Sequence, residues 1–338
     1  MNLNRLLKRR DAVYGFCAVW ILLFHIYRNI SLPAVPVLSN ALRLGNLGVD
    51  IFLFLSGICL SRSVARHQYT GKKWFIFYQR RCFRVLLPYL IVAIPFFCWA
   101  AIFERSGGLI RRVALFFSDL FYLTFLIYGT QTIWFVLGIM ICYLLFPLLY
   151  RCAVKASCVQ KLMLLLGILC FAFVAAFLPY LHNLEIVWAR LPIFVIGAYF
   201  GTYKEPSNYS KKSTLPLCVA SVLTILLLGW AVSSNWIPSR SDAWLLIRWL
   251  VYVPVTLAFL YLVSHFGPQS RVLAWLGTIS LEIYLVHITA IRLLRFYGML
   301  DLWGGWTYLV LPLFTVPAAW LVHKLAGCIQ KRIGGNAA

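Results

Sequence analysis

Charged residues are scarce in this chain of 338 residues. Asp, Glu, Lys and Arg make up 12% of it, whereas soluble domains contain roughly 25%. Acidic residues are the scarcest, with 9 Asp and Glu against 31 Lys and Arg, while 62% of residues are hydrophobic. This balance excludes a soluble globular protein and indicates an integral membrane protein.

The 10 cysteines give no sign of a shared site, because they are scattered and no C-x-x-C occurs. We therefore expect neither a metal site nor a disulfide framework. The chain also lacks an internal repeat, a low-complexity linker and any soluble appendage longer than a loop. We predict a single integral-membrane domain over residues 1–338.

Long hydrophobic runs are what the sequence does contain. A helix needs about 20 apolar residues to cross a bilayer. Ten candidates lie near residues 12–30, 46–61, 84–103, 132–150, 162–179, 190–203, 214–233, 246–264, 272–290 and 306–325. The predicted fold is an all-α polytopic membrane helix bundle with about ten transmembrane helices.

An eleventh stretch, residues 113–127, is shorter and is interrupted by Ser118 and Asp119. Lysines favour cytoplasmic loops. Ten spans and a cytoplasmic N-terminus put all ten lysines inside, whereas an eleventh crossing would put seven of them outside. We therefore predict ten spans, both termini in the cytoplasm, and a re-entrant or interfacial helix at 113–127.

The net charge of +22 then forms a basic cytoplasmic rim. Such a rim suits anionic membrane lipids and phosphorylated ligands, and we expect no nucleic-acid partner. The first apolar run is too long for a cleaved signal peptide, so it stays as a helix. The predicted location is the cell membrane, in a multi-pass arrangement.

Two ionisable side chains, His25 and Asp50, lie inside the first two apolar stretches. Ionisable groups within a membrane span are costly and usually functional. Both are predicted at a comparable depth towards the outer face, where the two side chains could meet. A carboxylate that binds one ring nitrogen would leave the other as a base. The structural alternatives are a histidine satisfied by a neighbouring helix and an aspartate that caps its own helix.

Basic residues mark the cytoplasmic ends of these spans. Arg10, Tyr14 and His25 follow the helical repeat and share one face of the first helix. Arg81 and Arg84 are three residues apart at the start of the third span, where two guanidinium groups could bind a phosphate. Plain topology anchoring is the alternative function of that pair.

Five further polar or aromatic residues are weaker candidates to line a site. Glu282, with Ser280 nearby, is mid-span in the ninth stretch and needs a partner or a proton. His287 is expected near the outer face, where histidines are often merely solvated. Arg190, at the start of the sixth span, is expected to anchor the helix by snorkelling to the interface. Trp134 is expected to belong to an aromatic belt.

Seven motifs, in this order, resemble those of the membrane-bound acyltransferase 3 family. They are His25 in the first span, residues 48–57 (GVDIFLFLSG), Arg81-x-x-Arg84 before 87–89 (LPY), 134–137 (WFVL), 146–149 (FPLL), 190–192 (RLP) with Gly197 and Gly201, and 279–287 (ISLEIYLVH). Each motif alone is weak. Together they run through most of the chain.

That resemblance implies transfer of an acyl group, commonly acetyl, from cytoplasmic acyl-CoA to a hydroxyl of a glycan or lipid-linked saccharide. It gives His25 the position of the catalytic histidine. Family members usually carry Arg or Lys eleven residues before this histidine, where this chain has Tyr14. Either Arg10 supplies the missing cation, or the Arg81 and Arg84 pair does, or the catalytic arrangement is weakened.

The resulting hypothesis places the CoA phosphates on Arg81 and Arg84 and the pantetheine arm between helices. His25 then deprotonates the acceptor hydroxyl or relays the acyl group, and Asp50 orients the ring. Two other functions stay open. One is a polytopic transporter or exporter of a glycan or lipid-linked intermediate, although no related halves are visible. The other is a catalytically inactive family member, which Tyr14 keeps in consideration.

Overall fold

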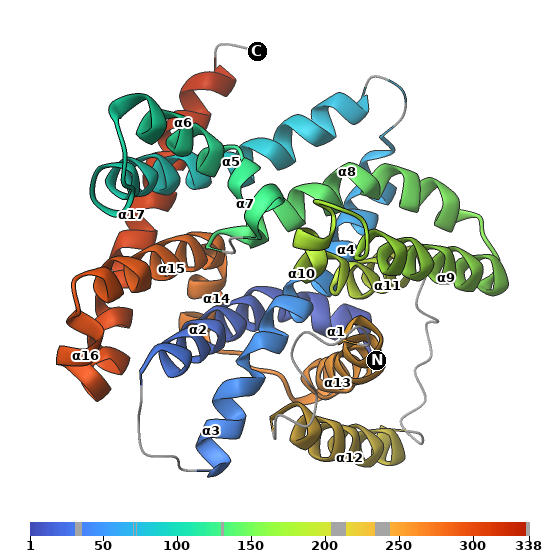
Figure 1. Cartoon of the computed structure of the whole chain (residues 1–338). Coiled ribbons are helices and arrows are strands. Elements are labelled where there is room, and N and C mark those ends of the chain that lie inside the picture. Colours follow the sequence, from blue (N-terminus) through green and yellow to red (C-terminus); the bar gives the residue numbers. More distant parts are fainter. Residues whose placement is uncertain are drawn as a thin grey trace. The chain divides into compact units, whose positions relative to one another are not determined.

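The computed structural model describes residues 1–30, 36–69, 71, 73–129, 132–203, 214–233 and 244–335, and its regular structure in these ranges is helical (Figure 1). Eight helices there are long and apolar enough to cross a bilayer. A ninth candidate is a pair of helices bent by 72°, and a shorter apolar helix covers Leu215–Leu228. The predicted all-α polytopic bundle is confirmed, and the bent pair and the short helix occupy the ninth and seventh predicted spans.

The chain forms two compact units, each assembled from separate stretches. The first, called unit 1, comprises residues 1–68, 146–173 and 188–280. The second, unit 2, comprises residues 69–145, 174–187 and 281–338.

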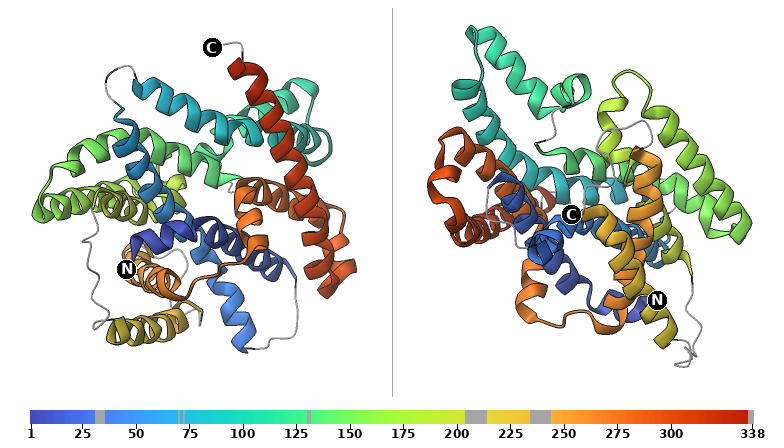
Figure 2. Two further views of the ribbon diagram at one scale, coloured as in Figure 1. Left: turned by 180° about the vertical axis from the view of Figure 1, so that it is seen from behind. Right: turned by 60° about the horizontal axis from the view of Figure 1, so that its bottom comes forward.

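Unit 1 contains the first two spans and most of the C-terminal half of the sequence. Its helices are α1 (Leu3–Lys8), α2 (Arg10–Asn29), α3 (Pro36–Arg43), η1 (Leu44–Asn46), α4 (Leu47–His67), most of α9 (Cys158–Ala175), α11 (Leu191–Thr202), α12 (Thr214–Ser233), α13 (Trp244–Phe266), α14 (Arg271–Thr278) and the end of α8 (Trp134–Val154). α12 and α13 lie side by side (Figure 1, Figure 2).

Helix α4 is buried because glycines let α11 approach it closely. A Cβ atom on Gly57 would lie 2.4 Å from the Phe194 carbonyl oxygen, and one on Gly197 would lie 2.2 Å from that of Phe54. Ser61 donates a hydrogen bond of 2.8 Å to the Ala198 carbonyl at the same interface. Small residues and hydroxyls are how membrane helices pack closely without a hydrophobic driving force between them.

Helices α2 and α4 run antiparallel in a definite register. Tyr14 stacks on Phe52 with ring centroids 4.9 Å apart. A Cβ on Gly48 would touch Ile21 and the Cys17 carbonyl. The numbers of two residues that face each other across α2 and α4 therefore add to about 67. Asp50 of α4 thus lies level with Cys17 of α2.

Unit 2 is built around one long helix and its neighbours. Its elements are α5 (Lys73–Trp99), the π-helical turn η2 (Ala100–Glu104), α6 (Leu109–Leu120), α7 (Leu123–Tyr128), the first half of α8, η3 (His182–Leu184), most of α10 (Glu185–Trp188), α15 (Ser280–Phe296), α16 (Met299–Trp303), η5 (Gly304–Trp306) and α17 (Thr307–Gly335). α5 and α17 are in contact.

The segment at 113–127, which was predicted to be a re-entrant or interfacial helix, is divided into two short helices. α6 ends at Leu120 and α7 starts at Leu123, with Tyr122 between them in the left-handed region at φ 62°. The 12 residues of α6 extend about 18 Å, well short of the roughly 30 Å of hydrocarbon.

Two predicted boundaries were wrong. Residues 62–83, which lie between the predicted second and third spans, are mostly helical, because α4 extends to His67 and α5 starts at Lys73. The ninth span is not continuous either, since α14 ends at Thr278 and α15 starts at Ser280. Polar residues at helix ends continue a helix beyond the bilayer, so apolar runs alone underestimate its length.

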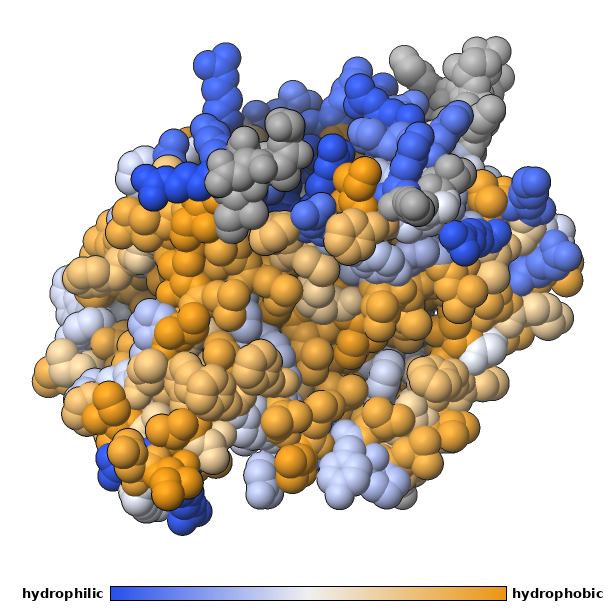
Figure 3. Space-filling model, turned by 90° about the horizontal axis from the view of Figure 1, so that it is seen from above, coloured by the Kyte–Doolittle hydropathy of each residue, from blue (hydrophilic) through white to orange (hydrophobic). Residues whose placement is uncertain are grey.

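Large hydrophobic side chains are exposed along many of these helices, including Leu109, Leu144 and Leu250, and hydrophobic residues cover most of the face in Figure 3. Such a surface is expected where lipid, not water, is the solvent. Lys72, Lys204, Lys211 and Lys212 lie outside the described residues. The cytoplasmic location of the termini stays a prediction.

We expect Gly197→Leu to prevent stable folding, because its side chain would collide with the α4 backbone at Phe54. Gly167→Leu on α9 is the matched control, since nothing lies within 4 Å of a Cβ there. Size-exclusion chromatography of the detergent-solubilised protein after a heating series measures the effect. Equal midpoint temperatures of unfolding for the two variants would contradict the close α4–α11 contact.

Candidate functional site

His25 lies near the end of α2 in unit 1, with its ring half-buried. Its Nδ1 atom is 2.9 Å from the carbonyl oxygen of Ile21, one turn earlier. A carbonyl only accepts hydrogen bonds, so Nδ1 carries the proton and Nε2 of the neutral ring carries the lone pair. This is the tautomer that a base acting through Nε2 requires.

Asp50 lies in the first turn of α4 and is only 3% exposed. Its carboxylate is 3.4 Å from the Arg248 guanidinium and 3.9 Å from that of Arg190. Arg190 also donates a hydrogen bond of 2.7 Å to Asn46, and Arg248 lies 4.0 Å from the ring centroid of Tyr252. Two positive charges and one negative charge therefore share a site inside unit 1.

The predicted meeting of His25 and Asp50 is not what the structure shows. The carboxylate binds the two arginines, and the ring Nδ1 binds a backbone carbonyl. In the α2–α4 register Asp50 is level with Cys17, eight residues or about 12 Å along α2 from His25. The prediction started the second helix at residue 46, but α3 and η1 precede it, so Asp50 lies deeper than expected.

Arg190 was expected to snorkel to the interface, and this was wrong. The residue is 2% exposed and precedes α11, where it binds Asn46 and approaches Asp50. A buried carboxylate within reach explains why the side chain stays inside.

Tyr14 and Arg10 share a face of α2 but contact different residues. Tyr14 stacks on Phe52 in an apolar contact. Arg10 is exposed, is paired with Asp11 at 2.9 Å and lies 4.0 Å from the Cys59 sulfur. The positive charge of Arg10 is therefore paired with Asp11 at the N-terminal end of α2.

Arg81 and Arg84 are both in unit 2, one turn apart on α5. Arg84 is exposed, and the half-buried Arg81 lies 5.8 Å from the ring centroid of Phe77. The two guanidinium groups thus lie on one side of the helix, as the spacing predicts.

Glu282 is at the first turn of α15, not mid-span, because Ile279 separates α14 from α15. The buried carboxylate is 2.8 Å from Nδ1 of His323 on α17, a residue that carried no signal in the sequence. Ser280 is the first residue of α15.

His287 was expected near the outer surface, yet it is fully buried. Its Nδ1 binds the Ile283 carbonyl at 2.7 Å, and its ring lies 5.8 Å from that of Tyr284. Trp134 starts α8 and is half-buried beside a cleft of unit 2, together with Arg105 and Arg292.

Arg248 is the functional candidate that sequence reasoning missed. It lies inside the predicted span 246–264, where an intramembrane cation is as unusual as His25, so the same argument would have found it. Asn46 and His323 carried no comparable signal. In the described part of the chain no three His, Cys, Asp or Glu side chains are grouped to hold a metal ion.

We expect Asp50→Ala to lower the stability of the fold by about 3–5 kcal/mol, because it leaves two buried guanidinium groups without their carboxylate. Adding Arg248→Met to Asp50→Ala should recover part of the loss, since one of the uncompensated charges is then gone. Thermal unfolding of the purified variants measures the coupling. Strictly additive losses would contradict a shared charge site.

The model of the acyltransferase 3 family, described as an acyltransferase domain, matches residues 11–324. The comparisons with curated proteins and with solved structures find no match. The matched range is nearly the whole chain and includes His25, Asp50, Arg190, Arg248 and Glu282. This chain belongs to the acyltransferase 3 family and is a multi-pass membrane acyltransferase.

Proposed function

We propose that this protein transfers an acyl group, acetyl in the simplest case, from cytoplasmic acyl-CoA to a hydroxyl of a cell-surface or lipid-linked glycan. The family membership supports acyl transfer in general. The single observation that carries the proposal is the contact between Nδ1 of His25 and the Ile21 carbonyl inside a membrane helix, which favours the tautomer with the lone pair on Nε2 as a proton acceptor.

In the proposed step, Nε2 of His25 removes the proton of the acceptor hydroxyl while the hydroxyl oxygen attacks the thioester carbonyl. The new C–O bond forms as the C–S bond breaks, and the proton leaves with the CoA thiol. The Ile21 carbonyl takes over the orienting role that was expected of Asp50. Relay of the acyl group through His25 is the alternative use of the same nitrogen.

The Asp50, Arg190 and Arg248 cluster then has a different task. It carries one net positive charge, at side chains that are 3–4% exposed. A positive site in a low-dielectric interior suits an anionic group on the donor or the negative charge that develops during acyl transfer. Asp50 acts as a positioning residue, because it holds the two guanidinium groups.

The cluster also offers a substitute for the Arg or Lys that family members usually carry at the position of Tyr14. Asp50 is level with Cys17 and so lies within one turn of Tyr14 along α2. Arg248, which contacts Asp50, brings a guanidinium group from α13 to this depth. Arg10 is a poorer substitute, because it is exposed and paired with Asp11.

The CoA phosphates are assigned to Arg81 and Arg84 at the basic end of α5. One guanidinium group is half-buried and the other exposed, on neighbouring turns. This arrangement allows both to reach a phosphorylated ligand that arrives from water.

We expect His25→Gln to lower acetyl transfer by about 10²–10⁴-fold, because glutamine keeps a polar side chain but cannot accept the proton. His265→Gln is the matched control, since that ring also binds the carbonyl one turn earlier. The measurement is the transfer of labelled acetyl from acetyl-CoA to glycan in membranes. Wild-type transfer in His25→Gln would remove the base assignment, and glycan flux without labelling would favour a transporter.

We expect Arg81→Ala and Arg84→Ala each to raise the KM for acetyl-CoA by roughly tenfold, the cost of one charge-assisted hydrogen bond. Arg80→Ala removes the same charge from a different side of α5 and should leave the KM nearly unchanged. The KM is measured with membranes of each variant. Equal effects of all three substitutions would indicate a general basic surface.

A further inference from the structure

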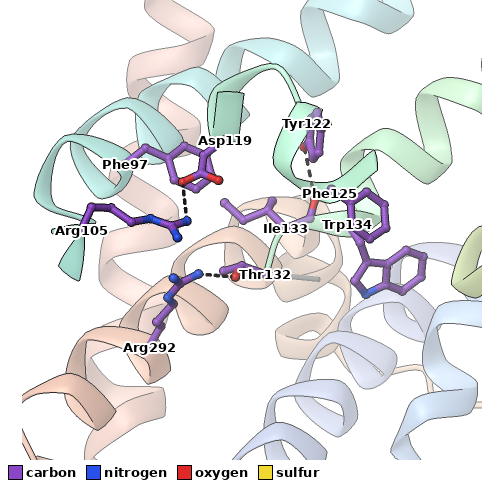
Figure 4. Close-up of a pocket in the computed structure, with 9 residues that line it drawn as sticks. All are labelled: Phe97, Arg105, Asp119, Tyr122, Phe125, Thr132, Ile133, Trp134 and Arg292. Carbon is purple, nitrogen blue, oxygen red and sulfur yellow. Dashed lines mark hydrogen bonds and ion pairs between the residues drawn. The ribbon is translucent and has the colours of Figure 1, made fainter. Parts of the chain in front are cut away.

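A cleft in unit 2 gathers polar and aromatic side chains from segments that are distant in the sequence (Figure 4). Arg105, Asp119 and Arg292 line it together with Thr132, Tyr122 and Trp134. The two guanidinium groups point into the same space, and aromatic rings border it. Concave sites with aromatic walls and a few convergent polar groups are where proteins bind small polar ligands.

The charges of this cleft are already paired. Arg105 lies 2.9 Å from Asp119, and Arg292 binds Glu104 through two nitrogens at 2.7 and 3.1 Å. Arg292 also donates a hydrogen bond of 2.6 Å to the Thr132 hydroxyl. The four charged groups sum to zero, so the cleft does not favour an ion.

The same groups still offer hydrogen bonds. Nε of Arg105 is buried and makes no hydrogen bond within the described residues. Buried donors of this kind are costly unless a ligand or water satisfies them. The four charged side chains are 10–32% exposed, and three of them, Arg105, Asp119 and Arg292, line the cleft.

The backbone at the cleft is unusual as well. α5 ends in the π-helical turn η2, which carries Glu104 at its last position and is followed by Arg105. Single π-helical turns within helices are frequently found at functional sites. The turn brings Glu104 to Arg292 and Arg105 to Asp119.

The cleft and the proposed CoA phosphate site lie far apart along one helix, because α5 continues into η2. From Arg84 to Glu104 there are 20 residues of helix, or about 30 Å, which is the thickness of the hydrocarbon core. If Arg84 faces the cytoplasm, the cleft faces the outer side. That is where an acceptor would arrive.

We propose that this cleft binds a neutral saccharide segment of the acyl acceptor. The inference rests on the proposed function, which supplies the reason for an acceptor site. Hydroxyl groups of a sugar both donate and accept, as the paired Arg105–Asp119 and Arg292–Glu104 groups require. The apolar faces of the sugar ring lie against Trp134 and its neighbouring aromatic rings.

The test uses the purified full-length protein in detergent and saturation-transfer difference NMR with three neutral probes, maltohexaose, cellohexaose and chitohexaose. Binding of at least one probe is expected. Thr132→Val, which preserves shape but removes the hydroxyl bound by Arg292, and Trp134→Leu should each weaken it at least tenfold. Trp306→Leu, an exposed tryptophan of η5, is the matched control and should bind normally.

Failure of all three neutral probes would overturn the inference, as would a preference for hexagalacturonate or equal binding by Trp134→Leu and wild type. The KM for acetyl-CoA in the same preparations separates this result from the proposed function. An unchanged donor KM with lost saccharide binding supports the acceptor cleft. Normal saccharide binding without any acetyl transfer by the wild type would overturn the proposed function but leave the binding site standing.

Discussion

The structure depends on the cost of placing ionisable groups where water is absent. In hydrocarbon a polar group must find a partner within the protein, or the segment that carries it does not stay there. Asp50 binds Arg190 and Arg248, Glu282 binds His323, and His25 and His287 each bind a carbonyl one turn earlier. Asp50 and Glu282 are held across helices, so the polar groups fix which helices are neighbours.

Close packing of small residues makes these pairings possible. Gly57 and Gly197 allow α4 and α11 to approach until backbone meets backbone, and Arg190 lies directly before α11. The arginine therefore enters unit 1 beside the first turn of α4, where Asp50 is located. The RLP and GVDIFLFLSG motifs, which are distant in the sequence, contribute to one interface.

The helical spans could be predicted from the sequence, whereas the depth of individual side chains could not. Hydropathy locates a span because a bilayer requires a fixed apolar length. It does not show where the helix starts, and α3 and η1 before α4 displaced Asp50 by about 12 Å relative to His25. Glu282 and His287 show the same limit, since the break at Ile279 moves Glu282 to a helix end and His287 turns inward.

Partners across the sequence were the other part that patterns did not predict. Arg81 and Arg84 could be related by their spacing on one helix, but Asp50 and Arg248 are 198 residues apart and lie on different helices. Only the fold brings them together. Arg248 was nevertheless detectable as an intramembrane cation, and a rule that pairs each buried acid with such a cation would have proposed this contact.

The neutral partner of His25 has a chemical consequence. A carboxylate at Nδ1 would stabilise an imidazolium through its charge, whereas the Ile21 carbonyl fixes the tautomer without adding charge. The cluster of Asp50, Arg190 and Arg248, about 12 Å away along α2, combines two positive charges with one negative charge. In the proposed step, a positive cluster of this kind suits the negative charge that would develop on the thioester oxygen. The same polar groups that hold the helices together therefore set the electrostatics in which acyl transfer is proposed to occur.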